Sequence, residues 1–315
     1  MEIGGYFGLE EFSGNEYYSN LIALNTGRNA LAYLIRAREI KKIFIPSFLC
    51  DSIYKVCERE GCDYSFYEVG RDFQPIFNRS LNDNEWLYVV NYYGQITNEV
   101  ELKKKYGNII LDNVQAFFQK PHKGIDTIYS CRKYFGVPDG SYLASDCDEI
   151  TLPVDISNSR MTHLLGRYEE NASKYYISFN DNDESFYELE LRYMSKLTHN
   201  ILRAVKYEDV KRKREENFNY LHNKLKKYNK LIINNPVGPY MYPFYYANSL
   251  ELKAKLVKNN IYIPTLWPNT LKIEGVAMEY SQNILPIPVD QRYGLDQMNI
   301  VIEEIVDYMK YGGFK

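Results

Sequence analysis

Short apolar runs alternate with amphipathic segments between residues 21 and 144. Strict apolar runs of four to six residues are typical of buried strands, and apolar positions three to four residues apart are typical of helices covering a core. The pattern predicts strands over residues 42–46, 64–69, 86–91 and 108–112, and helices over residues 29–37, 51–60 and 99–106. Strands that alternate with helices predict an α/β fold with a mostly parallel central sheet flanked by helices.

The second half of the chain has a different pattern. Residues 152–183 show no clear period and predict an irregular segment, whereas residues 184–228 predict a helix with Val210, Phe218, Leu221 and Leu225 on one stripe. The shorter pieces that follow predict strands over residues 231–234, 241–247 and 261–264, and helices over residues 250–259 and 296–311. We therefore expect a large domain over residues 1–205 and a smaller C-terminal α+β domain over residues 206–315.

Charge and cysteine content narrow the class of protein. The chain has 38 Lys and Arg against 41 Asp and Glu, a formal charge of −3, which argues against a nucleic-acid partner. The basic run at residues 211–214 therefore predicts a solvated helix face. Five cysteines without a CxxC pair, and an N-terminus without a secretory leader, predict a cytoplasmic protein with reduced thiols.

Membrane and metal sites are not expected. The longest uncharged stretch, residues 231–250, contains prolines, a glycine and asparagines that would break and hydrate a transmembrane helix. The four histidines have no metal-ligand spacing with each other or with the cysteines. No membrane partner and no metal centre are predicted.

One candidate binding element is Thr26-Gly27-Arg28, directly before an amphipathic helix. Free amide groups and the positive end of the helix dipole make such a start suitable for a phosphate. The alternative is a plain N-cap, in which the Thr26 hydroxyl satisfies the first turn. The sequence leaves both interpretations open.

Two further candidates follow apolar strands. Asp112 ends one strand, with Gln115 three residues later, and at the carboxyl edge of a sheet such an acid can pair with a protonated ring nitrogen. Lys133 follows another strand, three residues after Ser130, and the neighbouring charge of Arg132 favours the free amine needed for Schiff-base chemistry. The alternatives are an N-cap for Asp112 and two surface cations on a turn for Arg132 and Lys133.

Taken in order, these elements resemble the DegT/StrS family of sugar aminotransferases, which are pyridoxal phosphate (PLP) enzymes of fold type I. Thr26-Gly27-Arg28 is similar to the family's Ser-Gly-Thr start, and Asp112 with Gln115 to its Asp-x-x-Gln element. Tyr93-Gly94-Gln95 and Pro46-Ser47 match two further motifs. The resemblance covers residues 21–143 well and the C-terminal part faintly.

The resemblance implies a role for each candidate residue. Lys133 would bind PLP covalently, Asp112 would hold the pyridine nitrogen, and Gln115 would lie near the ring oxygen. The phosphate would be held by Thr26, Gly27, Arg28 and Ser130. Cys50 occupies the position of the family's stacking aromatic, so Phe48, two residues earlier, is expected to take that place.

The function that the resemblance implies is transfer of an amino group from an amino acid, glutamate, to a nucleotide-linked keto-sugar in surface polysaccharide or amino-sugar biosynthesis. A homodimer is expected, because family members complete each site across a dimer interface. Two alternatives stay open. One is a non-catalytic relative that binds a nucleotide-sugar or a partner, and the other is a PLP-dependent lyase or dehydratase, although family dehydratases replace the lysine by histidine.

Overall fold

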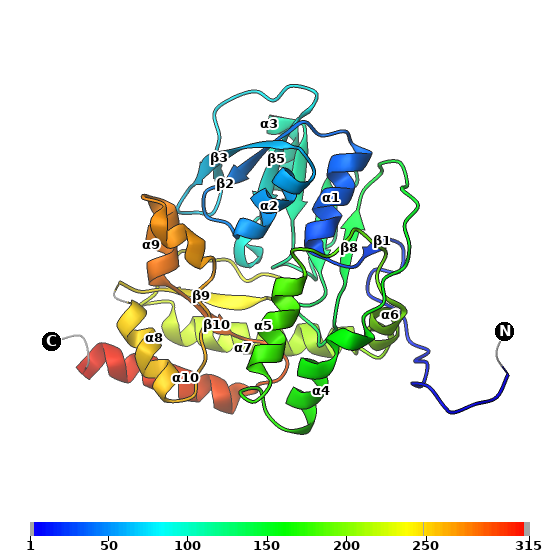
Figure 1. Ribbon diagram of the computed structural model, residues 1–315. Helices are drawn as coiled ribbons and strands as arrows, with labels where there is room; N and C mark the ends of the chain where they lie inside the picture. Colours follow the sequence, from blue (N-terminus) through cyan, green and yellow to red (C-terminus); the bar gives the residue numbers. More distant parts are fainter. Residues whose placement is uncertain (1–2, 248, 312–315) are drawn as a thin grey trace.

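An eight-stranded sheet forms the centre of the large part of the molecule, in the order β1-β8-β7-β6-β5-β2-β3-β4 (Figure 1). This computed structural model describes residues 3–247 and 249–311. The strands are β1 (Ile22–Leu24), β2 (Lys42–Pro46), β3 (Asp63–Val69), β4 (Pro75–Ile76), β5 (Glu85–Val90), β6 (Ile109–Asp112), β7 (Asp126–Ser130) and β8 (Ser141–Ala144). Neighbours from β7 to β3 pair in parallel, whereas β1, β8 and β4 pair antiparallel. The predicted mostly parallel α/β sheet is confirmed.

Helices cover both faces of this sheet. Helix α1 (Gly27–Ala37) packs on β7 and β8, α2 (Asp51–Arg59) packs on β3 and α1, and α3 (Glu99–Tyr106) packs on β6. In β5, the five residues 86–90 are all buried. Successive strand side chains point to opposite faces, so a continuous buried run requires cover on both. The predicted helices and strands in this region match the observed ones to within two residues.

The C-terminal part is a small α+β unit beside the large sheet (Figure 1). Strands β9 (Met241–Tyr245) and β10 (Ile284–Pro288) pair antiparallel. The helices of this part are α7 (Tyr207–Leu225), α8 (Ser249–Lys258), α9 (Val276–Asn283) and α10 (Leu295–Tyr311). The predicted α+β character is confirmed, and the domain boundary near residue 205 stays a prediction.

Two of the predicted C-terminal strands are wrong. Residues 231–234 and 261–264 form no strand. Their apolar side chains Leu231, Ile233 and Ile263 are nevertheless buried. These short apolar runs therefore anchor loops to the core without pairing their backbone in a sheet.

The predictions for residues 152–228 need correction. The segment expected to be irregular contains α4 (Thr162–Glu169) and α5 (Tyr176–Ser185), and the single long helix expected after it is divided into α6 (Lys196–Arg203) and α7. In α5 the one buried residue is Asn182, so this helix has no apolar stripe for a periodicity argument to detect. Between α5 and α6 the chain turns, and the Ser195 hydroxyl caps α6 by accepting from the Thr198 amide at 3.2 Å.

The basic run at residues 211–214 is only partly a solvated face. Arg212 is exposed, and Lys211 and Lys213 are half-buried. Arg214 is 1% exposed, so the prediction is wrong for this residue. Its guanidinium is buried because four oxygens of neighbouring segments accept its hydrogen bonds.

Within residues 3–247 and 249–311, the helices lack the combination of length and apolar composition that a membrane crossing requires.

The central strand β5 offers a test of the core. Leu87 is 0% exposed, so Leu87→Ala is expected to lower the free energy of unfolding by about 2–5 kcal/mol through lost burial and a residual cavity. Ile232 is 99% exposed, and Ile232→Ala should change it by less than about 0.5 kcal/mol. Urea unfolding monitored by circular dichroism measures both. Equal effects at the two positions would contradict the placement of β5 in the core.

Candidate functional site

Asp112 and Lys133 lie at the carboxyl ends of two adjacent parallel strands. Strand β6 ends at Asp112, which pairs in register with Ile128 of β7, and Lys133 lies in the turn three residues after β7 ends at Ser130. The carboxyl ends of parallel strands meet in one crevice. The structure therefore brings together the acid and the amine that the sequence placed on separate strands.

The electrostatics of Asp112 reflect this proximity. Its carboxyl is 3% exposed, and burial raises its pKa above the usual value. The positive charge of Lys133 acts in the opposite direction and lowers the pKa of Asp112. A buried carboxylate is costly unless it is paired and hydrogen-bonded, so this acid is suited to hold a cation.

Two hydrogen bonds fix the Asp112 carboxylate. The Tyr88 hydroxyl donates to Oδ2 at 2.8 Å, and the amide of Val114 donates to Oδ1 at 2.9 Å. The bond to Val114 is a local turn contact, and because the described residues directly after Asp112 form no helix, the helix N-cap interpretation of this residue is wrong. Tyr88 is a contribution from β5 that the sequence did not reveal. Both bonds lower the pKa of Asp112 and set the orientation of its oxygens.

Gln115 follows Asp112 by three residues, and only the oxygen of its side-chain amide has a hydrogen-bond partner among the described residues. Its Oε1 accepts from the backbone amide of Tyr93 at 2.8 Å. Its Nε2 is buried and has no hydrogen-bond partner among the described residues. Leaving a buried donor unpaired costs about 1–3 kcal/mol, so this group is suited to a ligand acceptor. Tyr93 has the left-handed backbone conformation (φ 55°), which for a non-glycine residue is often found at functional sites.

The start of α1 lies over the same two strands. Thr26 is the N-cap, and its hydroxyl accepts from the Asn29 amide at 3.0 Å, as the plain cap interpretation predicted. A Cβ on Gly27 would lie 3.8 Å from Val114 and 3.9 Å from Ile128, so the helix start contacts the region of Asp112. The first-turn amides of Gly27 and Arg28 have no intrahelical acceptor. The helix cap uses the Thr26 hydroxyl and the Asn29 amide, whereas an anion would use the amides of Gly27 and Arg28, so both interpretations of this helix start are compatible.

Arg28 at the start of α1 and Arg132 in the turn after β7 share one carboxylate. Asp183 of α5 lies 3.1 Å from Arg132 Nη1 and 4.0 Å from Arg28 Nη2. The Nε of Arg28 is buried without a partner among the described residues. Burial lowers the pKa of Arg132, and Asp183 offsets part of this cost. Asp183 was missed because its helix carries no apolar stripe.

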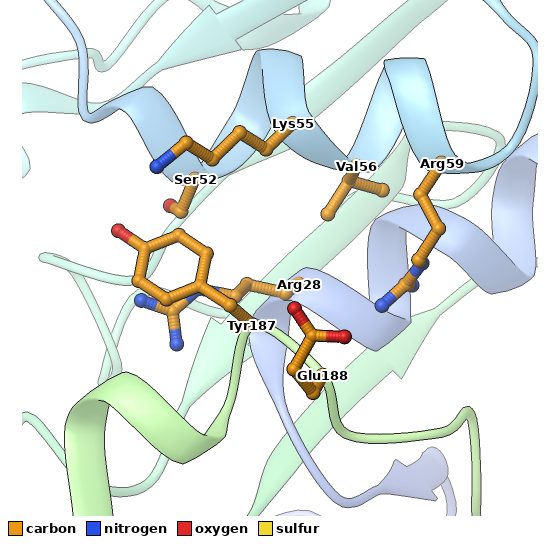
Figure 2. A pocket seen from close by; sticks show the side chains of 7 residues that line it. All are labelled: Arg28, Ser52, Lys55, Val56, Arg59, Tyr187 and Glu188. Atoms are coloured by element: carbon orange, nitrogen blue, oxygen red, sulfur yellow. The ribbon is translucent and has the colours of Figure 1, made fainter. Parts of the chain in front are cut away.

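A cavity of about 260 Å³ opens between α1 and α2 next to Arg28 (Figure 2). The ring of Tyr187 has Arg28 at 4.5 Å and Lys55 at 4.4 Å from its centroid, and its hydroxyl donates to Asp51 at 2.9 Å. Figure 2 shows Arg59 at the other end of the cavity, with Glu188 nearby. Three cations and one acid, Glu188, line this cavity. Lys55 and Arg59 already pair with Asp51 at 2.6 Å and Glu60 at 3.0 Å, so the cations are partly neutralised.

Phe48 and Cys50 follow the end of β2. Phe48 is 1% exposed and packs against Tyr92 and Trp267, with ring centroids 5.3 and 4.5 Å away. Cys50 is half-buried at the N-cap of α2. Neither contact involves Asp112 or Lys133, and the stacking role of Phe48 stays a prediction.

Lys133 faces an aromatic ring from the C-terminal part. Its Nζ lies 5.5 Å from the ring centroid of Tyr240, and Lys133 is half-buried. Tyr240 precedes β9 and is remote from Lys133 in sequence, so no local pattern indicated the contact. The arrangement as a whole places a lysine amine, a buried acid, an unpaired amide donor and the start of a helix near the carboxyl ends of β6 and β7.

Comparison with known proteins establishes the fold. Neither a protein-family model nor a curated protein matches the chain. Among solved structures, a DegT/DnrJ/EryC1/StrS aminotransferase from Brucella abortus is similar, with 16% identity, coverage of 91% of this chain and 85% of that chain, and a TM-score of 0.61. NtdA from Bacillus subtilis, solved with bound cofactor PMP, has 14% identity, coverage of 92% and 73%, and a TM-score of 0.67. The sugar aminotransferase CalS13 from Micromonospora echinospora has 15% identity, coverage of 90% and 86%, and a TM-score of 0.58. The predicted fold type I architecture is confirmed.

The raised pKa of Asp112 has a testable effect on stability. A folded-state pKa above the unfolded value gives stability that is full below the unfolded pKa of about 3.9 and is lost as the pH rises through the folded value. Asp112→Asn stays neutral and should gain stability relative to the natural chain between about pH 4 and about pH 8. Urea unfolding of the cofactor-free protein at both pH values measures this difference.

The exposed Asp307 of α10 provides the matched control. Asp307→Asn should show the same stability difference from the natural chain at both pH values. A gain of the natural chain over Asp112→Asn as the pH rises would contradict the burial of this acid.

Proposed function

We propose that the chain is a PLP-dependent aminotransferase in which Lys133 binds the cofactor and Asp112 holds its ring nitrogen. The observation that carries the proposal is the placement of this amine and this buried acid at the ends of β7 and β6, close enough for the charge of Lys133 to lower the pKa of Asp112. The fold shared with solved aminotransferases supports it.

The residues present fit PLP. Asp112 offers a buried acceptor for a protonated pyridine nitrogen, and the unpaired Nε2 of Gln115 offers a donor for the ring oxygen. The phosphate would be held by the amides of Gly27 and Arg28, the Arg28 side chain and the Ser130 hydroxyl, with Thr26 capping the helix. A bound PLP ring supplies the electron sink for chemistry at the α-carbon of an amino acid.

Each residue then has a defined task. Lys133 Nζ takes the proton from the α-carbon of the donor and returns it when the amino group is delivered to the acceptor. Asp112 keeps the proton on the ring nitrogen, while Tyr88 and the Val114 amide hold the carboxylate in place. Gln115 orients the ring through its free amide group. The family's dehydratases replace this lysine by histidine, and a binding protein has no need of it. A PLP-dependent lyase would use the same lysine and acid, and it stays an alternative.

The proposed substrate class is supported by similarity and by charge. The acceptor would be a nucleotide-linked keto-sugar and the donor glutamate, with a role in surface polysaccharide or amino-sugar biosynthesis. Support comes from CalS13, which is described as a sugar aminotransferase, and from the cationic cavity next to Arg28. We further propose a cytoplasmic homodimer without nucleic-acid or membrane partners.

The position of the reactive amine can be mapped directly. Protein purified with PLP should be yellow, and borohydride reduction followed by peptide mass spectrometry should place the cofactor on Lys133. Lys133→Met should abolish the label. Lys120→Met is the matched control, because Lys120 also lies over a tyrosine ring, 3.5 Å from the centroid of Tyr17, but away from the proposed site. A label on another lysine would contradict the proposal.

The phosphate contacts can be separated from the ring contacts. Arg28→Met should weaken PLP binding about tenfold, because a charge-assisted bond to the phosphate is lost, and should leave binding of pyridoxal, which has no phosphate, nearly unchanged. Arg36→Met alters an exposed arginine at the other end of the same helix and serves as control. Fluorescence titration measures both ligands. Equal losses for PLP and pyridoxal would remove Arg28 from the phosphate site.

A further inference from the structure

Arg214 is a charged side chain in a place where packing alone would favour an apolar one. It is 1% exposed and lies on the buried face of α7, together with Phe218, Leu221 and Leu225. Asp290 pairs with Arg292 at 2.6 Å, and its negative charge also raises the pKa of Arg214 and offsets part of the effect of burial. An apolar residue of similar volume would avoid the desolvation cost of this guanidinium. What an arginine adds at this position over an apolar residue is its set of hydrogen bonds.

These hydrogen bonds connect three segments that are distant in sequence. Arg214 Nη1 donates to the carbonyls of Pro239 at 2.9 Å and Tyr240 at 3.3 Å. Nη2 donates to the carbonyl of Tyr134 at 3.4 Å, and Nε donates to Oε1 of Gln291 at 2.9 Å. The planar guanidinium presents its donors in a fixed fork, so it fixes these segments relative to one another.

Two of these carbonyls belong to residues next to Lys133, one in the chain and one in space. Tyr134 directly follows Lys133 in the chain, and its carbonyl accepts a second bond from Gln291 Nε2 at 2.8 Å. Tyr240 supplies the ring that lies 5.5 Å from Lys133 Nζ. The guanidinium itself lies over the Tyr134 ring, 4.3 Å from its centroid. One side chain of α7 thus holds both the backbone that carries the lysine and the backbone of the ring that faces it.

We propose that Arg214, assisted by Gln291, is a positioning residue for Lys133. The guanidinium holds the turn after β7 against the segment before β9, so the C-terminal part of the chain sets the position of the lysine amine. This inference rests on the proposed function of Lys133. It adds that the large sheet alone cannot fix the position of Lys133. The hydrogen bonds to the turn that carries this lysine come from Arg214 of α7 and from Gln291 after β10.

The test compares variants of α7 in the cofactor-free protein. Arg214→Met removes all four bonds with little change in volume, Arg214→Lys keeps the charge but loses the fork, and Arg212→Met alters an exposed neighbour that pairs with Glu216 at 2.7 Å. Brief acetylation with acetic anhydride, followed by peptide mass spectrometry, measures the rate at Lys133 relative to Lys120 in the same sample. Melting temperature is recorded for each variant.

A positioning role predicts that Arg214→Met and Arg214→Lys both change the relative rate at Lys133 several-fold, whereas Arg212→Met does not. It also predicts about tenfold weaker PLP binding, since small displacements of a reacting group have large effects. A purely structural role would lower the melting temperature and leave the relative rate at Lys133 and the PLP affinity unchanged. That result, in a folded Arg214 variant, would overturn the inference.

Gln291→Leu keeps the test decisive if Arg214→Met does not fold. This change removes the 2.8 Å bond to the Tyr134 carbonyl and the 2.9 Å bond from Arg214 Nε, and it leaves the bonds of Arg214 to Pro239, Tyr240 and Tyr134. It should change the acetylation rate at Lys133 relative to Lys120 several-fold, and an unchanged relative rate would overturn the inference. If PLP fails to label Lys133 in the natural chain, the proposed function fails, but the acetylation rates still decide whether Arg214 positions this lysine.

Discussion

The burial of Asp112 is the constraint on which the site depends. A carboxylate that is 3% exposed is stable only if other groups compensate for the lost water. Here the compensation comes from the Tyr88 hydroxyl, the Val114 amide and the charge of Lys133. Tyr88 lies on β5, which neighbours β6 on one side, and Lys133 lies in the turn after β7, which neighbours β6 on the other side. The parallel sheet is therefore what allows one buried acid to face a cation in a crevice.

The surroundings of Lys133 are built from the other end of the chain. The sheet supplies the turn that carries the lysine. Arg214 and Gln291, both after residue 206, donate to the carbonyl of Tyr134, the next residue in that turn. The ring of Tyr240 faces the lysine amine. A site made in this way depends on how the C-terminal part packs on the sheet. The proposed positioning role would account for a fully buried arginine at this place in the fold.

The sequence predicts the elements that carry a strong pattern and misses those that do not. Strand β2 and helix α3 have the predicted bounds, because an apolar run and a helical spacing bury them. Helix α5 has no apolar stripe, so Asp183 could not be placed near Arg28 and Arg132.

Residue type alone also misplaces side chains. Arg214 was expected in solvent, but its carbonyl partners lie in segments that only the tertiary fold brings to it. Asp112 and Lys133 were found because both follow apolar strands, whereas Tyr88 looks like any other core residue of β5.

The central claim, that Asp112 keeps the ring nitrogen protonated, is tested most directly by the ¹⁵N chemical shift of PLP labelled at that nitrogen and bound to the protein. A shift characteristic of a protonated pyridine that is lost in Asp112→Asn is predicted. A neutral nitrogen in the natural chain would contradict the account.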